Sequence, residues 1–362
     1  MNVLIAGGGV GGLTTALCLA RFGIKATIFE ASPQLNEPGA GLQLSPNCSR
    51  VLHNLGLEKR ILKKSSIPSG MQFREWDSGG IIGESELGIH AIERYGYPYY
   101  QVHRQDLIKF LADAAEDDPN IEIQKGVSVS GFRQNNEIVT LLAAGKDYHG
   151  DLLVGADGIH SIVREGLWGQ KKARFTGNVA WRALVPANCL PKDFVLPVTT
   201  AWWGPKKHFV HYYVRGGELV NCVCVVEKKG WEKESWNERG DYDELKSDFV
   251  GWHGDIQKLL DNADRKQLFK WALFDREPMS RWGEGRVTLL GDACHPMLPF
   301  MAQGAAMAIE DAAVLARCLS GTQDIPNALS RYEDLRRGRT ASAQRNSRLN
   351  ASVFHFSGVK AW

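Results

Sequence analysis

Short apolar runs recur along the chain, and the first belongs to a regular strand–helix–strand pattern. Residues 3–6 are uniformly apolar, as in a buried parallel strand, and residues 25–29 (KATIF) are predicted as a second strand. Between them, residues 13–22 carry apolar side chains at helical spacing, and Gly23 follows where a glycine commonly ends a helix. The pattern predicts a β-α-β unit of the kind that builds α/β proteins.

Two later apolar runs are also followed by glycine and aspartate. Residues 151–154 precede Gly-Ala-Asp-Gly at 155–158, and residues 287–290 precede Gly291-Asp292. A helix is predicted after each turn, and the second of these helices extends from about Gly304 to residue 319. The repeated order of strand, turn and helix predicts three segments of one discontinuous domain.

The stretch between the second and third segments has a different pattern, with short strands that are rich in aromatic residues. These predicted strands are residues 175–185, 198–203, 207–214 and 219–226. They predict an antiparallel sheet laid over the first domain, a common way to form an apolar pocket.

Composition and charge narrow the class of protein. The chain has 362 residues, enough for two domains, and 44% hydrophobic and 23% charged residues are ordinary for a globular protein. A net charge of +2 gives no reason to expect nucleic acid or an anionic membrane as a partner. No apolar run approaches the roughly 20 residues that cross a bilayer, and no leader pattern is present, so we expect a cytoplasmic protein. The seven cysteines lack metal-ligand spacing, so we expect reduced thiols and no metal site.

The first turn has the glycine spacing of a dinucleotide site. Gly7 permits the tight turn, Gly9 lets the backbone approach a pyrophosphate, and Gly12 lets the helix pack on the strand. The helix N-terminus offers free N–H groups to the phosphates. Glu30 closes the second run, where a carboxylate can hold ribose hydroxyls, and it favours the unphosphorylated ribose of FAD or NAD over NADP.

The third turn adds features that suit a flavin. The Asp292 carboxylate at a strand end suits the ribityl hydroxyls. The helix that starts at Gly304 can offer N–H groups to the flavin pyrimidine edge, where negative charge builds on reduction. The three segments together predict FAD as the bound cofactor.

Four motifs give the chain a family resemblance. They are GAGLQLSPN at 39–47, QVHRQDL at 101–107, GADGIHSIVR at 155–164 and GDACHPMLPFMAQGAAMAIEDAA at 291–313. With them the chain resembles the single-component FAD-dependent aromatic hydroxylases of the p-hydroxybenzoate hydroxylase fold, in particular the salicylate, 3-hydroxybenzoate and 6-hydroxynicotinate hydroxylases. The resemblance covers nearly the whole chain.

The resemblance implies a fold class and a domain division. The class is α/β with α+β character, a Rossmann-like FAD-binding domain with an inserted antiparallel-sheet substrate domain. The FAD-binding domain comprises residues 1–70, 101–170 and 280–330, and the substrate domain comprises residues 71–100 and 171–279. Residues 331–362 form a C-terminal helical segment that packs behind the flavin domain.

The resemblance also implies contacts around the cofactor. Asp157 and Gly158 serve the FAD pyrophosphate and NAD(P)H, and Arg104 contacts the FAD diphosphate region. The alternative for Arg104 is a surface ion pair with Asp106. Gly41 belongs to a loop that flanks the flavin.

The activity that the resemblance implies is hydroxylation of a small phenolic or hydroxy-carboxylic aromatic substrate. NADH or NADPH docks transiently and reduces the flavin, and reduced flavin with O₂ forms a C4a-hydroperoxide that attacks the ring. The acting species is expected to be a monomer or a homodimer. The alternatives are a flavin-dependent halogenase or epoxidase of the same fold, or a non-catalytic flavin-binding redox sensor.

The strand at 207–214 carries the candidate substrate residues. Because its period is two, His208 and Tyr212 share one face and His211 lies on the other, and only one set can line a flavin-facing pocket. The resemblance favours His208, which can take the proton of a phenol, and His211 is the second candidate base. The alternative for His208 is a structural histidine at the sheet rim.

Three further residues are placed near the flavin. The resemblance puts Pro296 beside the isoalloxazine ring and His295 in the same turn. Phe300 and Trp181 are expected to line the substrate pocket. Phe300 stands where many salicylate- and hydroxynicotinate-type members have histidine, and its large apolar ring is expected to change the pocket wall above the flavin.

Overall fold

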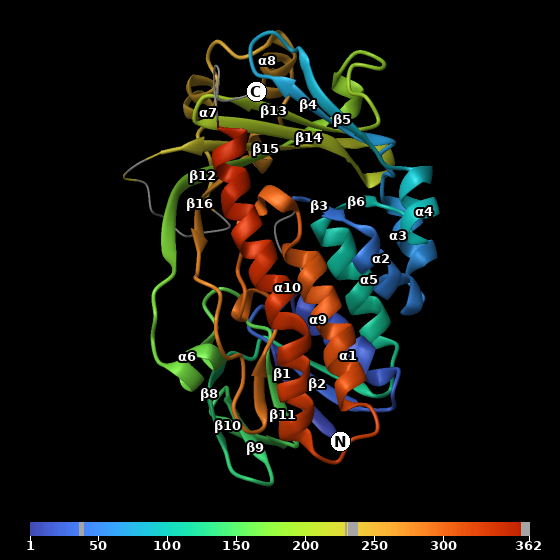
Figure 1. Cartoon of the computed structure of the whole chain (residues 1–362), viewed down its shortest axis with the longest axis vertical. Coiled ribbons are helices and arrows are strands. Elements are labelled where there is room, and N and C mark those ends of the chain that lie inside the picture. The colour runs from blue at the N-terminus through green and yellow to red at the C-terminus, as the bar shows by residue number, and fades with distance from the viewer. Residues whose placement is uncertain (36–39, 229, 231–237, 356–362) are drawn as a thin grey trace.

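The protein has two layered units joined by long helices (Figure 1). The structure is a computed structural model, and it describes residues 1–35, 40–228, 230 and 238–355. A parallel sheet lies at one end of the elongated molecule and a larger sheet lies across the other end. This arrangement confirms the predicted α/β class with its separate sheet unit.

The parallel sheet brings the three glycine segments side by side. Its strand order is β17-β11-β1-β2-β7, and all four pairings are parallel. The strands are β1 (Asn2–Ala6), β2 (Lys25–Glu30), β7 (Ile121–Lys125), β11 (Leu152–Gly155) and β17 (Val287–Leu289). The backbone N–H of Ala156 donates to the carbonyl of Ala6, and that of Leu290 donates to Gly155. The turns after β1, β11 and β17 therefore meet at one edge of the sheet.

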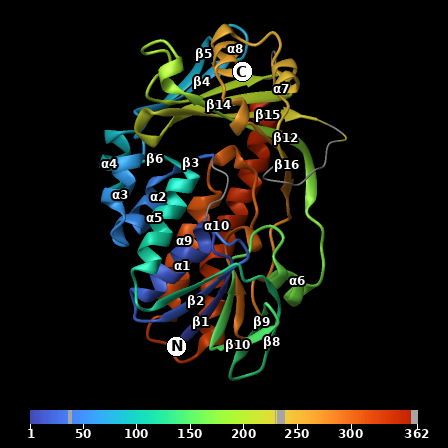
Figure 2. The same cartoon turned by 180° about the vertical axis from the view of Figure 1, so that it is seen from behind.

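Helices cover the parallel sheet on one face, and a small sheet lies beyond the other (Figure 2). The covering helices are α1 (Val10–Ala20), α5 (Arg104–Glu116), α9 (Gly304–Leu319) and α10 (Ile325–Phe354). The small sheet consists of β8 (Val129–Gln134), β9 (Val139–Ala143) and β10 (Lys146–Gly150), beside α6 (Ile162–Trp168). Helix α10 extends toward the seven-stranded sheet at the far end (Figure 1).

The second sheet has seven strands in the order β16-β12-β15-β14-β13-β4-β5. They are β4 (Gly70–Glu75), β5 (Ile81–Glu86), β12 (Arg174–Pro186), β13 (Thr199–Gly204), β14 (Lys207–Val214), β15 (Leu219–Glu227) and β16 (Phe269–Asp275). The four strands predicted from aromatic content are confirmed as β12 to β15. The sheet is mixed and not wholly antiparallel, because β4 pairs with β13 in the parallel direction.

The two faces of this sheet belong to different cores. The outer face packs on helices α7 (Tyr242–Asp248) and α8 (Gly254–Asp261), with Trp202, Phe209 and Phe249 among its buried residues. The inner face turns toward the unit that contains the parallel sheet, and Val225 there packs in one cluster with Phe300. Side chains that alternate along each strand therefore enter two separate environments.

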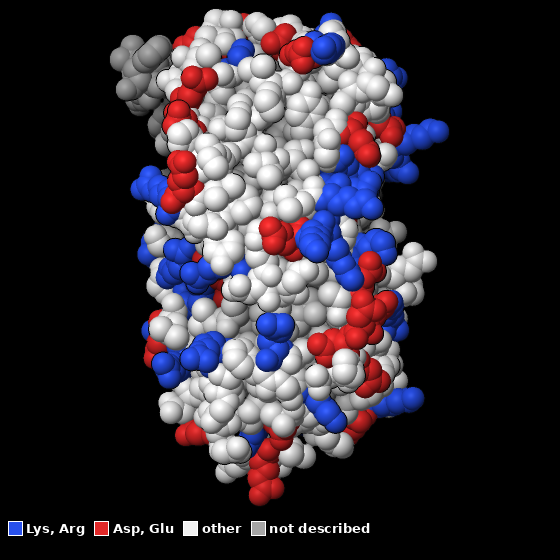
Figure 3. All heavy atoms as spheres, turned by 90° about the vertical axis from the view of Figure 1, so that its right-hand side faces the viewer, with Lys and Arg blue, Asp and Glu red and all other residues white. Residues whose placement is uncertain are grey.

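A short sheet and three helices lie under one end of the inner face. They are β3 (Gly41–Leu44), β6 (Tyr100–His103), α2 (Pro46–Asn54), α3 (Glu58–Lys64) and α4 (Ile89–Tyr95). Figure 3 shows this side of the molecule, where basic side chains gather at mid-height and a broad area above them carries few charged side chains. None of the described helices is long and apolar enough to cross a membrane.

Candidate functional site

The turn after β1 and the first turn of helix α1 each contain a glycine where a side chain would not fit. Gly7 has φ +102°, and an added Cβ would lie 2.4 Å from the carbonyl oxygen of Ala156. A Cβ on Gly12 would lie 2.0 Å from the carbonyl oxygen of Gly7. Both glycines thus permit the close approach of backbone segments that the fingerprint requires. Helix α1 begins after Gly9 without a side-chain cap, so its first N–H groups face the turn.

Glu30 lies at the end of β2, beside this turn. One carboxylate oxygen accepts from the N–H of Gly8 and the other from the N–H of Ser32, each at 2.7 Å. The carboxylate is therefore held beside the glycine turn, where the ribose of a dinucleotide would lie. Glycine turn, helix start and carboxylate together fit the ADP half of FAD.

The second segment joins the first and third. Asp157 accepts from the N–H of Ile162 at 2.8 Å and so caps α6, and Gly158 has φ +76°. The other carboxylate oxygen of Asp157 is buried and has no hydrogen-bond partner among the described residues. Burial raises the pKa of Asp157, although the hydrogen bonds that it accepts oppose this. Asp157 therefore combines a capping role with an acceptor that remains available at the turn.

Arg164 on α6 was not singled out from the sequence as a site residue, yet it ties two segments together. Its guanidinium donates to the carbonyl of Ala293 at 2.8 Å and to that of Ile159 at 2.6 Å. Ser161 accepts from the N–H of Arg164 and caps the same helix. In the sequence, Ser161 and Arg164 lie three positions apart. This spacing indicates a helix, but it does not indicate the contact of Arg164 with the third segment.

The third segment presents an exposed carboxylate and a helix start. Gly291 has φ +63°, and Asp292 follows it in a short turn directly after β17. Pro296 is buried in the same segment. Helix α9 begins at Gly304, as predicted, and Gln303 just before it donates to the hydroxyl of Ser45 at 3.0 Å.

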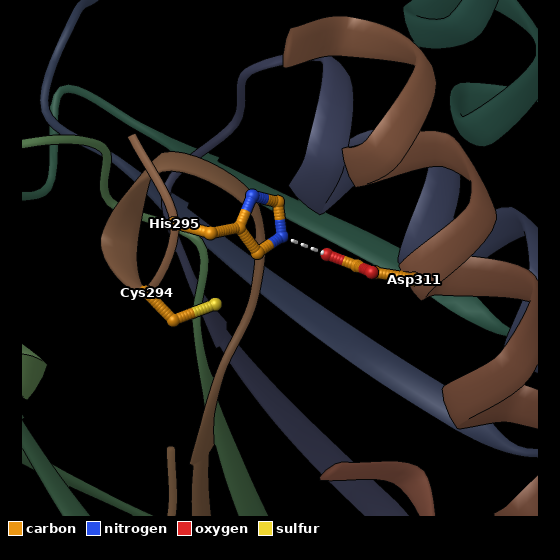
Figure 4. A group of neighbouring side chains, drawn as sticks. All are labelled: Cys294, His295 and Asp311. Atoms are coloured by element: carbon orange, nitrogen blue, oxygen red, sulfur yellow. Dashed lines mark hydrogen bonds and ion pairs between the residues drawn. The ribbon is translucent and has the colours of Figure 1, made fainter. Parts of the chain in front are cut away.

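Behind this turn lies a fully buried polar cluster (Figure 4). His295 Nε2 lies 2.5 Å from Asp311 Oδ2, and Arg336 Nε lies 2.6 Å from Asp311 Oδ1. Cys294, His295 and Asp311 also form a donor set of the kind that binds metals. However, burial raises the pKa of the Cys294 thiol, and the Arg336 cation already neutralises Asp311. We interpret the cluster as structural support for the turn.

The loop that flanks the flavin in the resemblance lies against the second sheet. The N–H of Gly41 donates to the side-chain carbonyl of Asn221 at 2.7 Å, and a Cβ on Gly41 would lie 2.6 Å from the Tyr212 ring. Gly39 of the same motif lies outside the described residues. Arg104 begins α5, and its N–H donates to the carbonyl of Ala40.

Asp106 on the same helix forms an ion pair across the units. Its carboxylate accepts from Arg215 at 3.0 Å. This contact links α5 with the turn between β14 and β15. Asp106, the acid in the alternative ion pair considered for Arg104, thus pairs with Arg215 in the structure.

The inner face of the second sheet carries His208 and Tyr212. His208 is 2% exposed, and its ring lies nearly perpendicular to the Phe300 ring, with the ring centroids 4.9 Å apart. Burial lowers the pKa of His208 well below its usual value, and His355 beside it adds to the effect. Burial raises the pKa of the Tyr212 phenol, so that group stays protonated.

The outer face holds two residues that the sequence analysis had placed at or near the pocket. His211 accepts from the indole N–H of Trp202 at 3.1 Å, and burial lowers the pKa of His211 to about 3. Trp181 donates from its indole N–H to Asp248 at 3.0 Å, in the core beneath α7. Both side chains point away from the inner face, and we therefore exclude Trp181 from the proposed substrate pocket.

Two inner-face residues were missed from the sequence. Arg182 on β12 is 5% exposed and lies 4.8 Å from the Trp271 ring. His355, after α10, hydrogen-bonds His208 at 2.8 Å. Arg182 could have been noticed as the charged residue in the otherwise largely apolar strand 175–185. No local sequence pattern connects residue 355 with β14.

Comparisons with known proteins agree with this geometry. A family model described as FAD binding domain matches residues 1–347. A 3-amino-4-hydroxybenzoate 2-monooxygenase of Streptomyces platensis is 38% identical over 98% of this chain and 88% of its own. A 3-hydroxybenzoate 6-hydroxylase of Klebsiella oxytoca is 36% identical over 99% and 90% of the two chains. A 6-hydroxynicotinate 3-monooxygenase of Bordetella bronchiseptica is 34% identical over 96% and 91%.

Solved structures show the same fold. Klebsiella pneumoniae HpxO, complexed with FAD and uric acid, has a TM-score of 0.90 and 28% identity, over 99% of this chain and 90% of that chain. A salicylate hydroxylase substrate complex has a TM-score of 0.82 and 27% identity over the same shares. The match extends over both sheets of this chain.

Proposed function

The chain belongs to the FAD-binding domain family of flavin-dependent aromatic monooxygenases, and from that premise we propose that it hydroxylates a small aromatic acid with a ring hydroxyl. The three relatives act, by their names, on 3-amino-4-hydroxybenzoate, 3-hydroxybenzoate and 6-hydroxynicotinate. Each of these compounds carries a carboxylate and a ring hydroxyl. We therefore place this substrate in the same chemical class.

The contact between His208 and Phe300 carries the proposal. It brings a buried imidazole of the second sheet against the GDACHPMLPF segment, which follows β17 of the parallel sheet. The inner-face residues around this contact are largely apolar, which suits an aromatic ring. A candidate base thus lies where the substrate sheet meets the third glycine segment.

His208 is suited to act as the base. Because burial lowers its pKa, the imidazole is neutral near pH 7 and can accept the proton of a ring hydroxyl. Loss of that proton raises the electron density of the ring. When bound, FAD would take two electrons from NADH or NADPH and activate O₂ for transfer of one oxygen atom, and the chain's own residues would position the substrate and exclude water.

Tyr212 and Arg182 are proposed to hold the substrate carboxylate. Both are buried on the inner face, and the Arg182 cation opposes the rise that burial causes in the pKa of Tyr212. A cation and a protonated phenol are good partners for a carboxylate. This assignment leaves His208, farther along the same face, for the ring hydroxyl.

The cofactor contacts remain proposals for individual residues. Gly7, Gly9, Gly12 and Glu30 would hold the ADP half, and Asp157 and Gly158 would serve the pyrophosphate and the reductant. At the other half, the proposed contacts are Asp292 with the ribityl chain, Arg104 with the diphosphate, Gly304 with the pyrimidine edge, and Gly41 and Pro296 beside the ring. The monomeric or homodimeric state and the cytoplasmic location stay predictions.

One assay tests the function. FAD-loaded protein is mixed with NADH or NADPH and each of the three compounds, and oxidation of the reductant, peroxide and product mass are measured. We expect at least one compound to accelerate oxidation and to gain one oxygen atom. If no compound accelerates oxidation of the reductant, the result contradicts hydroxylation and favours the non-catalytic sensor. A product that gains halogen instead of oxygen favours the halogenase alternative, and the peroxide measurement shows how much of the oxidation is uncoupled from product.

A further inference from the structure

A continuous chain of hydrogen bonds connects His208 with the surface. His208 Nδ1 lies 2.8 Å from His355 Nε2, and His355 Nδ1 lies 2.8 Å from Glu227 Oε1. The side chain of His355 is 4% exposed, whereas that of Glu227 is 45% exposed. The series of hydrogen bonds therefore begins at the buried inner face and ends at the solvent-exposed Glu227.

The chemistry of the three groups fixes the direction of each hydrogen bond. An ionised Glu227 can only accept, so His355 donates from Nδ1. Burial lowers the pKa of His355 and His208, so both rings are neutral near pH 7. A neutral His355 that donates from Nδ1 must accept at Nε2, and His208 therefore donates from Nδ1. His208 Nε2 is then the unprotonated nitrogen, and no described residue hydrogen-bonds it.

Packing holds the chain of groups in place. The carbonyl of His355 accepts from the N–H of Lys206 at 3.3 Å, and the N–H of Glu227 donates to the carbonyl of Lys206 at 2.9 Å. Phe354 stacks on Trp203 with ring centroids 5.0 Å apart. The end of α10 is thus fastened to the β13–β14 turn and to the end of β15, which aligns His355 between its two partners.

We propose that His355 and Glu227 are a proton relay that serves His208 and connects the substrate hydroxyl with solvent. The proposal rests on the proposed function and adds two positioning residues to it. The ring hydroxyl gives its proton to His208 Nε2, His208 Nδ1–H passes to His355 Nε2, and His355 Nδ1–H passes to Glu227. Glu227 then releases that proton to water. The reverse sequence reprotonates the product oxygen and restores both tautomers.

The competing role for His355 is to anchor the C-terminal helix only. His355→Gln separates the two roles, because an amide can accept from His208 and donate to Glu227 but cannot pass a proton between them. Glu227→Gln removes the carboxylate at the outer end of the hydrogen-bond series. Because this side chain is exposed, we do not expect the substitution to impair folding. His90→Gln is the matched control, since exposed His90 also pairs with a glutamate, Glu86, at 3.3 Å, on the distant α4.

The experiment follows proton release when FAD-loaded, oxidised protein binds 3-hydroxybenzoate or 3-amino-4-hydroxybenzoate in weak buffer with a pH indicator. We expect the wild type and His90→Gln to release a proton upon binding. His355→Gln and Glu227→Gln should release it about tenfold more slowly or worse, with unchanged affinity for FAD and the probe. For the wild type, proton release should be slower in D₂O than in H₂O.

The outcomes distinguish the relay from the proposed function. If the wild type oxidises NAD(P)H with a probe but the relay variants release protons as fast as the wild type, the relay is wrong and the function stands. Equal losses of probe binding and release in both variants would also overturn the relay, in favour of an anchor. A wild type that responds to no compound of the panel contradicts the proposed function itself, and the relay with it.

Discussion

Nε2 of His295 lies 2.5 Å from Oδ2 of Asp311, and both side chains are enclosed in the core. Arg336 of α10 occupies the second carboxylate oxygen. The turn that carries Asp292 is therefore fastened to α9 and α10 through one buried carboxylate. Burial alone would raise the pKa of Asp311, but His295 and Arg336 outweigh it and hold that pKa below its usual value.

We predict that Asp311→Asn lowers the free energy of unfolding by about 3–5 kcal/mol. The change removes the buried charge that His295 and Arg336 share, and among the described acids it leaves Arg336 paired with Glu310 alone. The pH dependence has a defined sign. Since the folded-state pKa of Asp311 is depressed, its contribution is present above the unfolded value near 3.8 and is lost as pH falls through the folded value. Urea denaturation of FAD-loaded protein at pH 7 and at a series of pH values below 3.8 measures both effects.

Asp147→Asn provides the comparison for this prediction. Asp147 pairs with Arg133 at 2.6 Å, but both side chains are largely exposed. Its loss should cost less than about 1 kcal/mol. Similar costs for Asp311→Asn and Asp147→Asn would show that the buried cluster does not stabilise the turn.

We predict that Gly12→Ala weakens FAD binding, because its Cβ would lie 2.0 Å from the carbonyl oxygen of Gly7. The displaced turn should cost about 1–3 kcal/mol, or roughly tenfold to hundredfold in FAD affinity. Gly338→Ala is the control, because this glycine is exposed in α10 with open space around it. It should leave FAD affinity unchanged and stabilise the fold by about 0.5–1 kcal/mol. Fluorescence titration with FAD tests the pair.

Local patterns predicted most of the elements correctly. Helix α9 starts at Gly304 and ends at residue 319 as expected, because apolar spacing and glycine turns act over a few residues. The parallel pairing of β4 with β13 was not predicted, because it joins residues more than a hundred positions apart. Helix α10 begins at Ile325, before the expected start of the C-terminal segment at residue 331, since Asp324 caps the helix there.

The candidate site was predictable only in part, for a similar reason. The period of two separated His208 and Tyr212 from His211, and the structure decides which set turns inward. The same alternation places Trp181 outward, but which face of β12 meets the core depends on its partners β15 and β16. His355 reaches His208 only through the path of α10 across the molecule.

We predict that Phe300→His shifts substrate preference toward 6-hydroxynicotinate. A histidine there would give the ring nitrogen of that substrate a hydrogen-bond partner, whereas Phe300 offers only an apolar edge beside His208. One new hydrogen bond is worth about 1 kcal/mol, so kcat/KM for 6-hydroxynicotinate relative to 3-hydroxybenzoate should rise about fivefold. Phe300→Leu, which adds no polar atom, should not produce this shift. The same change in both variants would mean that pocket size decides the preference.

The last prediction separates the two histidines of β14. His208→Gln should lower kcat by about 100- to 10,000-fold, the range of general acid–base catalysis, while FAD affinity stays unchanged. His211→Gln keeps an acceptor for the indole N–H of Trp202 on the outer face, so it should preserve kcat. In the wild type, activity should fall only as pH drops below 6.5, because burial lowers the pKa of His208 from that value and the neutral imidazole is the active form. Steady-state kinetics across pH, with FAD titrations of each variant, provide the measurement. If His208→Gln loses FAD binding and turnover to the same extent, His208 supports the interface between the two units and is not the base.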